Sequence, residues 1–166
     1  MTRVRSVGLV LALVAAGCRP AGPPEFTAQQ RAAVVDSVRA LLDSVATWMS
    51  TQGAGRPFAS FFDSSAAFVQ AADGRIAAPS YDSLVTRTRD WTPPAGATLA
   101  WDTVRIEPLG PGMAHFTAAF AEHYTPPSGP AYLGHGVMSG VVVRRPAGWR
   151  IVATHSSVVP PAAGGR

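Results

Sequence analysis

Between residues 98 and 159 the chain has the pattern of four long β-strands, and this stretch limits the fold more than any other. The strands span 98–107, 113–124, 132–144 and 149–159. The segments between them are short and rich in proline and glycine, as tight connections between antiparallel neighbours require. Helical patterns precede the strands in the chain. We therefore expect an α+β domain built on a long antiparallel sheet.

The first of these strands breaks its own alternation. Apolar residues fall at Leu99 and Trp101 and then at Val104 and Ile106, so the parity slips by one position. Such a slip predicts a β-bulge, which bends the strand. A curved sheet with helices laid across its concave side forms a cone, and such a cone often keeps a cavity that its own side chains do not fill.

Three helices are expected on the concave side. Thr27 and Gln30 have the spacing of a capping box, so the first helix begins there, and its apolar residues recur every three or four positions. A short second helix is predicted over 57–63, and Ser80 is placed to cap a third.

A small β-hairpin is expected between the second and third helices. Asp73-Gly74 is flanked by short apolar runs at 67–70 and 75–77. Asp-Gly is among the strongest sequence signals for a two-residue hairpin turn.

The first residues have the pattern of an export signal. Arg3 and Arg5 precede an apolar run over 7–16, which as a helix would be about 15 Å long, about half the hydrocarbon thickness of a bilayer. Residues 1–17 are therefore predicted to be a signal peptide rather than a membrane span. The segment that ends at Cys18 resembles the lipobox of bacterial lipoproteins, with Ala15 standing where Leu is usual.

We expect Cys18 to carry a lipid, because this lone cysteine has no disulfide partner in the chain. The alternative is ordinary secretory cleavage that leaves a free thiol. Residues 18–25 then form a lipidated linker, 26–160 a single domain and 161–166 a disordered tail. The protein is expected in the cell envelope, bound to the membrane through its lipid. In a Gram-negative cell, Arg19 after the cysteine favours the periplasmic side of the outer membrane.

The charges give no sign of a nucleic-acid partner. All basic residues are arginine, and loss of Arg3 and Arg5 with the signal leaves twelve of them against ten acidic residues. They are scattered along the chain, whereas a nucleic-acid interface gathers them on one face.

Four segments, in this order along the chain, resemble the SnoaL-like and calmodulin-dependent-kinase-association-like branch of the nuclear-transport-factor-2-like superfamily. They are FFDSSAAFV at 61–69, DGR at 73–75, LGPGMA at 109–114 and GWRIVATHSS at 148–157. The resemblance implies a cone of curved antiparallel sheet with three helices, commonly dimeric through the outer face of the sheet. It does not imply one function, because the superfamily includes isomerases, dehydratases, cyclases and non-catalytic assembly domains.

Aromatic and histidine side chains are the candidates for lining the cavity. We expect the pocket to include Trp48, Tyr81, Trp101, His115 and His135. A metal ion is not expected, because His115 and His123 lie about 26 Å apart on one strand and no motif gathers three ligands. No cofactor is expected either.

Two residues are the candidates for catalysis. Asp102 lies within a strand, and a carboxylate directed into an apolar cavity could act as acid or base. His155 ends the family-like strand, where alternation places it on the side of Ile151, and it is either a structural histidine or a pocket residue. Asp63 and Glu122 are the other acids, and Tyr81 and Tyr124 the phenols, that such a site could use.

The sequence leaves three functions open. We favour a lipid-anchored binding or assembly domain with an apolar pocket for a small molecule. The second alternative is a cofactor-free isomerase, dehydratase or cyclase. The third is a structural homodimer whose interior is filled by its own side chains and holds no ligand.

Overall fold

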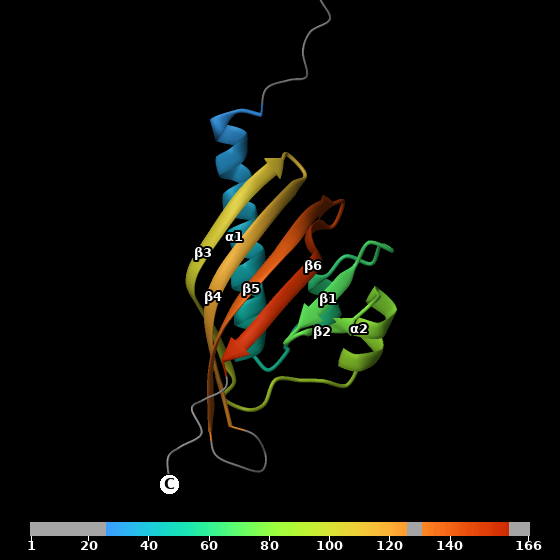
Figure 1. Ribbon diagram of the computed structural model, residues 1–166, viewed down its shortest axis with the longest axis vertical. Helices are drawn as coiled ribbons and strands as arrows, with labels where there is room; N and C mark the ends of the chain where they lie inside the picture. The colour runs from blue at the N-terminus through green and yellow to red at the C-terminus, as the bar shows by residue number, and fades with distance from the viewer. Residues whose placement is uncertain (1–25, 126–130, 160–166) are drawn as a thin grey trace, which may run out of the picture.

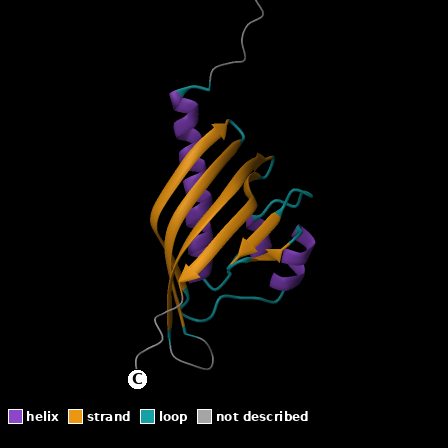
Figure 2. Cartoon of the chain, in the orientation of Figure 1, coloured by secondary structure: helices purple, strands orange, loops and turns teal. Residues whose placement is uncertain are grey.

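The computed structural model describes residues 26–125 and 131–159. Within these residues six strands form one curved sheet, accompanied by two α-helices and one short 3-10 helix (Figure 1, Figure 2). The α+β class is confirmed. The expected signal peptide, the linker with Cys18 and the C-terminal tail lie outside the described residues.

The four long strands lie where the sequence predicts them. They are β3 (Thr98–Gly110), β4 (Met113–Tyr124), β5 (Tyr132–Arg145) and β6 (Gly148–Val159). Each pairs antiparallel with the next along the chain. The curvature of these strands is plain in Figure 1, which agrees with the expected cone.

The predicted hairpin is also present, formed by β1 (Val69–Ala72) and β2 (Arg75–Ala78). It extends the sheet through a parallel pairing of β1 with β6. The strand order is therefore β2-β1-β6-β5-β4-β3. This one parallel pair departs from the fully antiparallel sheet that the sequence predicts.

The bulge predicted in the first long strand is found at Asp102. Trp101 pairs with Phe120 and Thr103 with Ala119, so Asp102 has no partner across the ladder. A second bulge, which the sequence analysis did not predict, lies in β6. There the pairing passes from Ile151 to Ala153 and leaves out Val152. Both bulges bend the sheet around its concave face.

The first helix, α1 (Ala28–Ser50), begins at the predicted capping box. The Gln30 amide donates to Thr27 Oγ1, and the Thr27 amide donates to the Gln30 side chain. The helix crosses one face of the sheet from end to end (Figure 1). Its buried stripe closes the core against that face and consists of Val34, Val38, Leu41, Leu42, Val45 and Trp48.

Of the other two expected helices, one is shorter than predicted. The other begins at Ser80 as predicted, where Ser80 Oγ accepts from the Ser83 amide at 3.2 Å, but it lies away from the concave face. The segment predicted over 57–63 forms only a four-residue 3-10 helix, η1 (Phe58–Phe61). Its chain leaves the helix at once, because the Asp63 amide donates to the carbonyl oxygen of Ile151 on β6 at 2.8 Å. The last helix, α2 (Tyr81–Thr88), lies beside the β1–β2 hairpin at the edge of the sheet (Figure 1). Of the α-helices, α1 alone crosses the concave face within the described residues.

Glycines on the concave side of β5 leave room for aromatic rings of β4. A Cβ atom at Gly136 would lie 2.5 Å from Cζ of Phe120, and one at Gly140 would lie 2.7 Å from Cε1 of Phe116. Both distances are far below van der Waals contact. The rings therefore lie against these glycines, where any larger residue would clash with them.

Candidate functional site

A groove opens between the C-terminal half of α1 and the concave face of the sheet, with a volume of about 420 Å³. We call it the α1 groove. Its walls are mainly apolar, with Met49, Phe58, Trp91, Leu99, Phe120 and Met138 as the largest apolar side chains. The described polar residues of its lining are Glu122, Tyr124 and Ser156. A concave apolar site of this volume suits a small organic molecule.

Glu122 is the sole charged side chain among the described residues that line the α1 groove. It follows Phe120 by two positions on β4, so both side chains face α1. Burial, and then the negative charge of Asp73, raise the pKa of the Glu122 carboxyl. No described residue forms an ion pair with it. The groove thus has one polar end and one apolar body.

Asp73 stands at the rim of the same end. Its amide donates to the carbonyl oxygen of Ser156, and its Oδ1 accepts from the amide of Val158, both at 3.0 Å. These two contacts fix the turn of the β1–β2 hairpin against β6, beside two residues of the groove lining. A second carboxylate is thereby held near Glu122.

Two phenols lie at this polar end, Tyr124 in the lining and Tyr132 beside it. The Tyr124 and Tyr132 rings lie 4.8 Å apart between centroids. Tyr132 lies across Gly134, the β5 residue that pairs with Glu122, since a Cβ atom at Gly134 would be 2.5 Å from the phenol oxygen. Burial, and then the charge of Glu122, raise the pKa of Tyr132. This phenol therefore keeps its proton and remains a hydrogen-bond donor.

Two of the five expected pocket residues support the wall of the groove from behind. Trp48 is buried, and its ring centroid lies 5.0 Å from that of Phe58 and 5.4 Å from that of Trp91. Trp101 packs edge-on against Phe120 at 6.2 Å. Its indole donates to the Leu42 carbonyl oxygen at 3.0 Å, which fixes β3 to α1.

The other three expected pocket residues lie away from the groove. Tyr81 packs against Phe68 near α2, with 6.2 Å between ring centroids. His115 and His135 are exposed on the side of β4 and β5 that faces away from α1. We call this side of the sheet the outer face. The strand alternation explains the placement, because Ala114 and Phe116 on either side of His115 are both fully buried against the core.

The two expected catalytic residues are exposed and are not part of the groove lining. Asp102 occupies the bulge of β3. Alternation predicted that His155 shares the side of Ile151, and this was wrong. His155 lies on the outer face, because the extra residue at Val152 inverts the alternation. Beyond that bulge Ser156 and Val158 face the groove, and His155 faces the opposite way.

The carboxylate that does line the groove, Glu122, was named in the sequence only as one of several acids. A signal for it exists. Phe116, Phe120 and Glu122 share one parity along a strand whose opposite parity carries His115 and His123. The contribution of Trp91 and Phe58 had no comparable signal, because both lie outside the regular strands.

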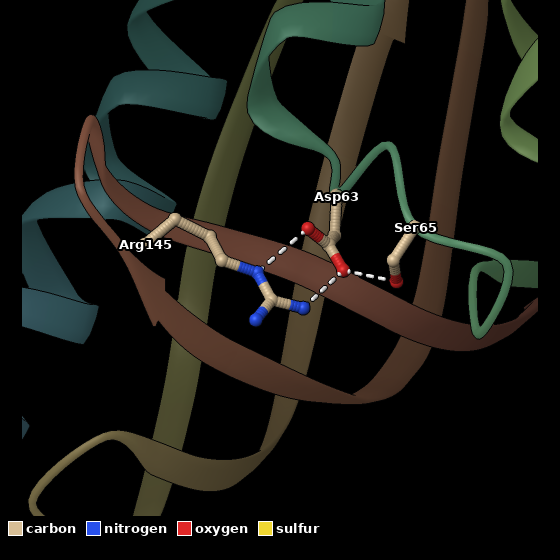
Figure 3. Close-up of polar contacts among 3 residues, drawn as sticks. All are labelled: Asp63, Ser65 and Arg145. Atoms are coloured by element: carbon tan, nitrogen blue, oxygen red, sulfur yellow. Dashed lines mark hydrogen bonds and ion pairs between the residues drawn. The ribbon is translucent and has the colours of Figure 1, made fainter.

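Asp63 belongs to a separate polar cluster near the β5–β6 hairpin (Figure 3). Arg145 donates through Nε to Oδ1 at 2.9 Å and through Nη2 to Oδ2 at 2.7 Å, and Ser65 Oγ donates to Oδ2 at 2.5 Å. These bonds, foremost those from Arg145, lower the pKa of Asp63. With every oxygen engaged, this carboxylate has a structural role.

Within the described ranges no three His, Cys, Asp or Glu side chains are arranged to hold a metal ion. No helix in this part of the chain combines the length and apolar character that a membrane span needs.

Comparisons with known proteins agree on the fold. A family model described as a SnoaL-like domain matches residues 38–161. No curated protein sequence matches the chain at a significant level.

Solved structures of similar fold come from several bacteria. One is the hexachlorocyclohexane dehydrochlorinase LinA-type3 from Novosphingobium barchaimii, with 13% identity, a TM-score of 0.64 and coverage of 82% of this chain and 96% of that one. Another is a nuclear transport factor 2-like superfamily protein from Salmonella enterica, with 17% identity, a TM-score of 0.61 and coverage of 81% and 95%. At these identities the similarity concerns the fold alone.

Proposed function

The chain belongs to the family of SnoaL-like domains, within the nuclear-transport-factor-2-like superfamily, and on this basis we propose that it binds an apolar small molecule in the α1 groove. The observation that carries the proposal is the open, mainly apolar volume of about 420 Å³ beneath α1. The apolar lining favours a ligand, because a groove that leaves apolar side chains in contact with water is typical of a binding site.

Titration with a neutral fluorescent probe, N-phenyl-1-naphthylamine, tests this proposal. Its emission rises when it leaves water for an apolar site. Met138 faces the groove from β5, and Met138→Trp would occupy the volume with a larger ring. We expect the wild type to bind the probe and Met138→Trp to weaken binding about tenfold or more, since much of the apolar contact is lost.

Ala40→Trp is the matched control, because Ala40 is exposed on α1. It adds the same indole outside the groove and should leave the titration unchanged. Equal weakening in both variants, or no binding by the wild type, would refute the proposal.

A second candidate function is a cofactor-free isomerase, dehydratase or cyclase that acts on an apolar carbonyl compound. Its support is the carboxyl of Glu122, whose pKa is raised by burial and by Asp73, next to the protonated phenol of Tyr132. Such a pair combines a base with a hydrogen-bond donor for developing negative charge. A hexachlorocyclohexane dehydrochlorinase also uses this fold.

Ring opening of 5-nitrobenzisoxazole is a general assay for a carboxylate base in an apolar site. The base takes the C3 proton, the electron pair forms the nitrile, and the N–O bond breaks to give a phenolate. For an enzyme we expect turnover that Glu122→Gln abolishes and that Glu107→Gln, on the exposed side of β3, retains. Absence of turnover leaves ligand binding as the function.

We also propose that the protein works as a homodimer, attached to the membrane of the cell envelope through a lipid on Cys18. The dimer is supported by apolar side chains on the outer face, among them Leu133 and Val137, which are 54% and 49% exposed. Val137→Arg should give a monomer in light scattering after size exclusion, whereas Ile76→Arg on β2 should not.

Mass spectrometry of the mature N-terminus tests the lipid anchor. We expect the mass of acyl chains on Cys18 in the wild type and its loss in Cys18→Ser.

A further inference from the structure

We infer that the ligand of the α1 groove is a hydrophobic amine, whose apolar body lies against the aromatic lining and whose cationic nitrogen meets Glu122. The inference rests on the proposed function and specifies the chemical class of the ligand. It follows from the charges that surround the groove and from the chemistry of its walls.

The first step concerns the charge of the lining. Glu122 projects from β4 into walls that are otherwise apolar or neutral over the described residues. Glu122 is partly buried, so its carboxylate loses part of its hydration, and a partner that donates hydrogen bonds or carries positive charge would offset this loss. No hydrogen bond or ion pair from a described residue reaches this carboxylate.

Asp63 shows how the same chain satisfies a buried carboxylate when no ligand is involved. Two hydrogen bonds from Arg145 and one from Ser65 saturate its oxygens. Among the residues that the structure describes, no arginine contacts Glu122 in this way. Arg87 lies beyond Phe58 and Trp91, and it donates to Ala77 O and Gln70 Oε1 instead.

The second step is the presence of Asp73 at the rim. Its carboxylate is held there by the amide of Val158. Two acidic groups at one end of the groove make the local potential negative, which attracts a cation and repels an anion. The same repulsion contributes to the raised pKa of Glu122, and a bound cation would relieve it.

The third step concerns the remainder of the lining. Phe58, Trp91, Phe120 and Tyr124 present aromatic surface to the groove, and Phe120 and Tyr124 flank Glu122 on β4. Aromatic faces attract both apolar groups and cationic nitrogen atoms. They therefore complement both the apolar body and the charged nitrogen of a hydrophobic amine. The two acidic groups at the polar end would repel an anionic ligand.

Three probes of nearly equal shape separate charge from apolar contact: 2-(1-naphthyl)ethylamine, 2-(1-naphthyl)ethanol and 1-naphthylacetate. Calorimetric titration of the wild type should show the amine binding about tenfold more tightly than the alcohol, as a charge-assisted hydrogen bond predicts. The acetate should bind most weakly of the three.

Glu122→Gln keeps the shape of the side chain and removes its charge. In this variant we expect the amine and the alcohol to bind within about twofold of each other, because the amine loses its charged partner. Glu107→Gln removes the same charge from an exposed position and should preserve the full preference. If Glu122→Gln does not fold, Asp73→Asn gives a second test, and it should reduce the preference for the amine about twofold to threefold.

The outcomes distinguish the two proposals. If the amine and the alcohol bind the wild type equally, the hydrophobic amine is excluded while the groove remains a binding site. A preference for the amine that survives in Glu122→Gln also overturns the inference, because the charge then acts elsewhere. Failure of all three probes to bind would remove the proposed function itself.

Discussion

Arg145, near the end of β5, holds the carboxylate of Asp63 through two parallel hydrogen bonds of 2.9 and 2.7 Å, across 82 positions of sequence. The carboxylate is almost completely buried, with 6% of the side chain exposed, whereas the Arg145 side chain is 44% exposed. The pair therefore joins the loop after η1 to the β5–β6 hairpin, so its removal should destabilise the fold.

Asp63→Asn should lower the free energy of unfolding by about 1–3 kcal/mol, since it removes charge-assisted hydrogen bonds from a buried site. Water can solvate the half-exposed guanidinium that remains, which limits the loss. Urea denaturation measures the change. Asp36→Asn, an exposed carboxylate on α1, is the control and should shift stability by less than about 0.5 kcal/mol.

Acid should weaken the fold through the same residue. The folded chain holds the pKa of Asp63 below its ordinary value of 3.8, so the unfolded chain binds the proton more tightly. The stabilisation is complete above pH 3.8 and is lost as the pH falls through the folded pKa. Denaturation curves between pH 2 and 5 should show a steeper loss for the wild type than for Asp63→Asn. Parallel curves would contradict this assignment.

Glu122 should have the opposite pH dependence. Its folded pKa lies above the ordinary value of 4.5, so the folded chain binds the proton more tightly and stability falls as the pH rises through that folded pKa. Glu122→Gln cannot ionise and should be more stable than the wild type at pH 7. The difference should vanish below pH 4.5, and its persistence there would mean that the effect is not electrostatic.

Gly136→Ala tests the packing of aromatic rings across β5. The new methyl group would lie 2.5 Å from Phe120 Cζ and 2.6 Å from the Ser157 carbonyl oxygen. Overpacking of this kind should cost about 1–3 kcal/mol of stability. Because Phe120 also lines the α1 groove, probe affinity should change as well.

Gly110→Ala is the matched control for this substitution. It adds the same methyl group where no atom lies within 4 Å of the new position. Thermal melting should place it close to the wild type. Equal destabilisation in the two variants would mean that the loss of glycine, and not the clash with the Phe120 ring, causes the effect.

Local signals in the sequence predicted much of the fold. The capping box at Thr27 fixed the start of α1, and the slipped parity around Asp102 located a bulge. Each depends on residues close together in the chain, so short-range spacing was sufficient.

The candidate site was harder to predict, because its geometry depends on pairing between distant strands. The bulge at Val152 lies among apolar and small residues on both parities, so alternation alone did not reveal it. One inserted residue moved His155 to the outer face and brought Ser156 to the groove. The wall formed by Trp91 depends on how the segment between α2 and β3 crosses the end of α1, which no local pattern encodes.

The position of β6 in the sheet has a consequence for how the protein is made. Although β6 is the last described strand in sequence, it lies in the middle of the sheet, between β5 and β1. The hairpin near residue 73 therefore lacks its neighbour until residues 148–159 have left the ribosome. Until then the edge of the sheet formed by β1 and β2 has no strand to pair with, so this part of the sheet can form only late.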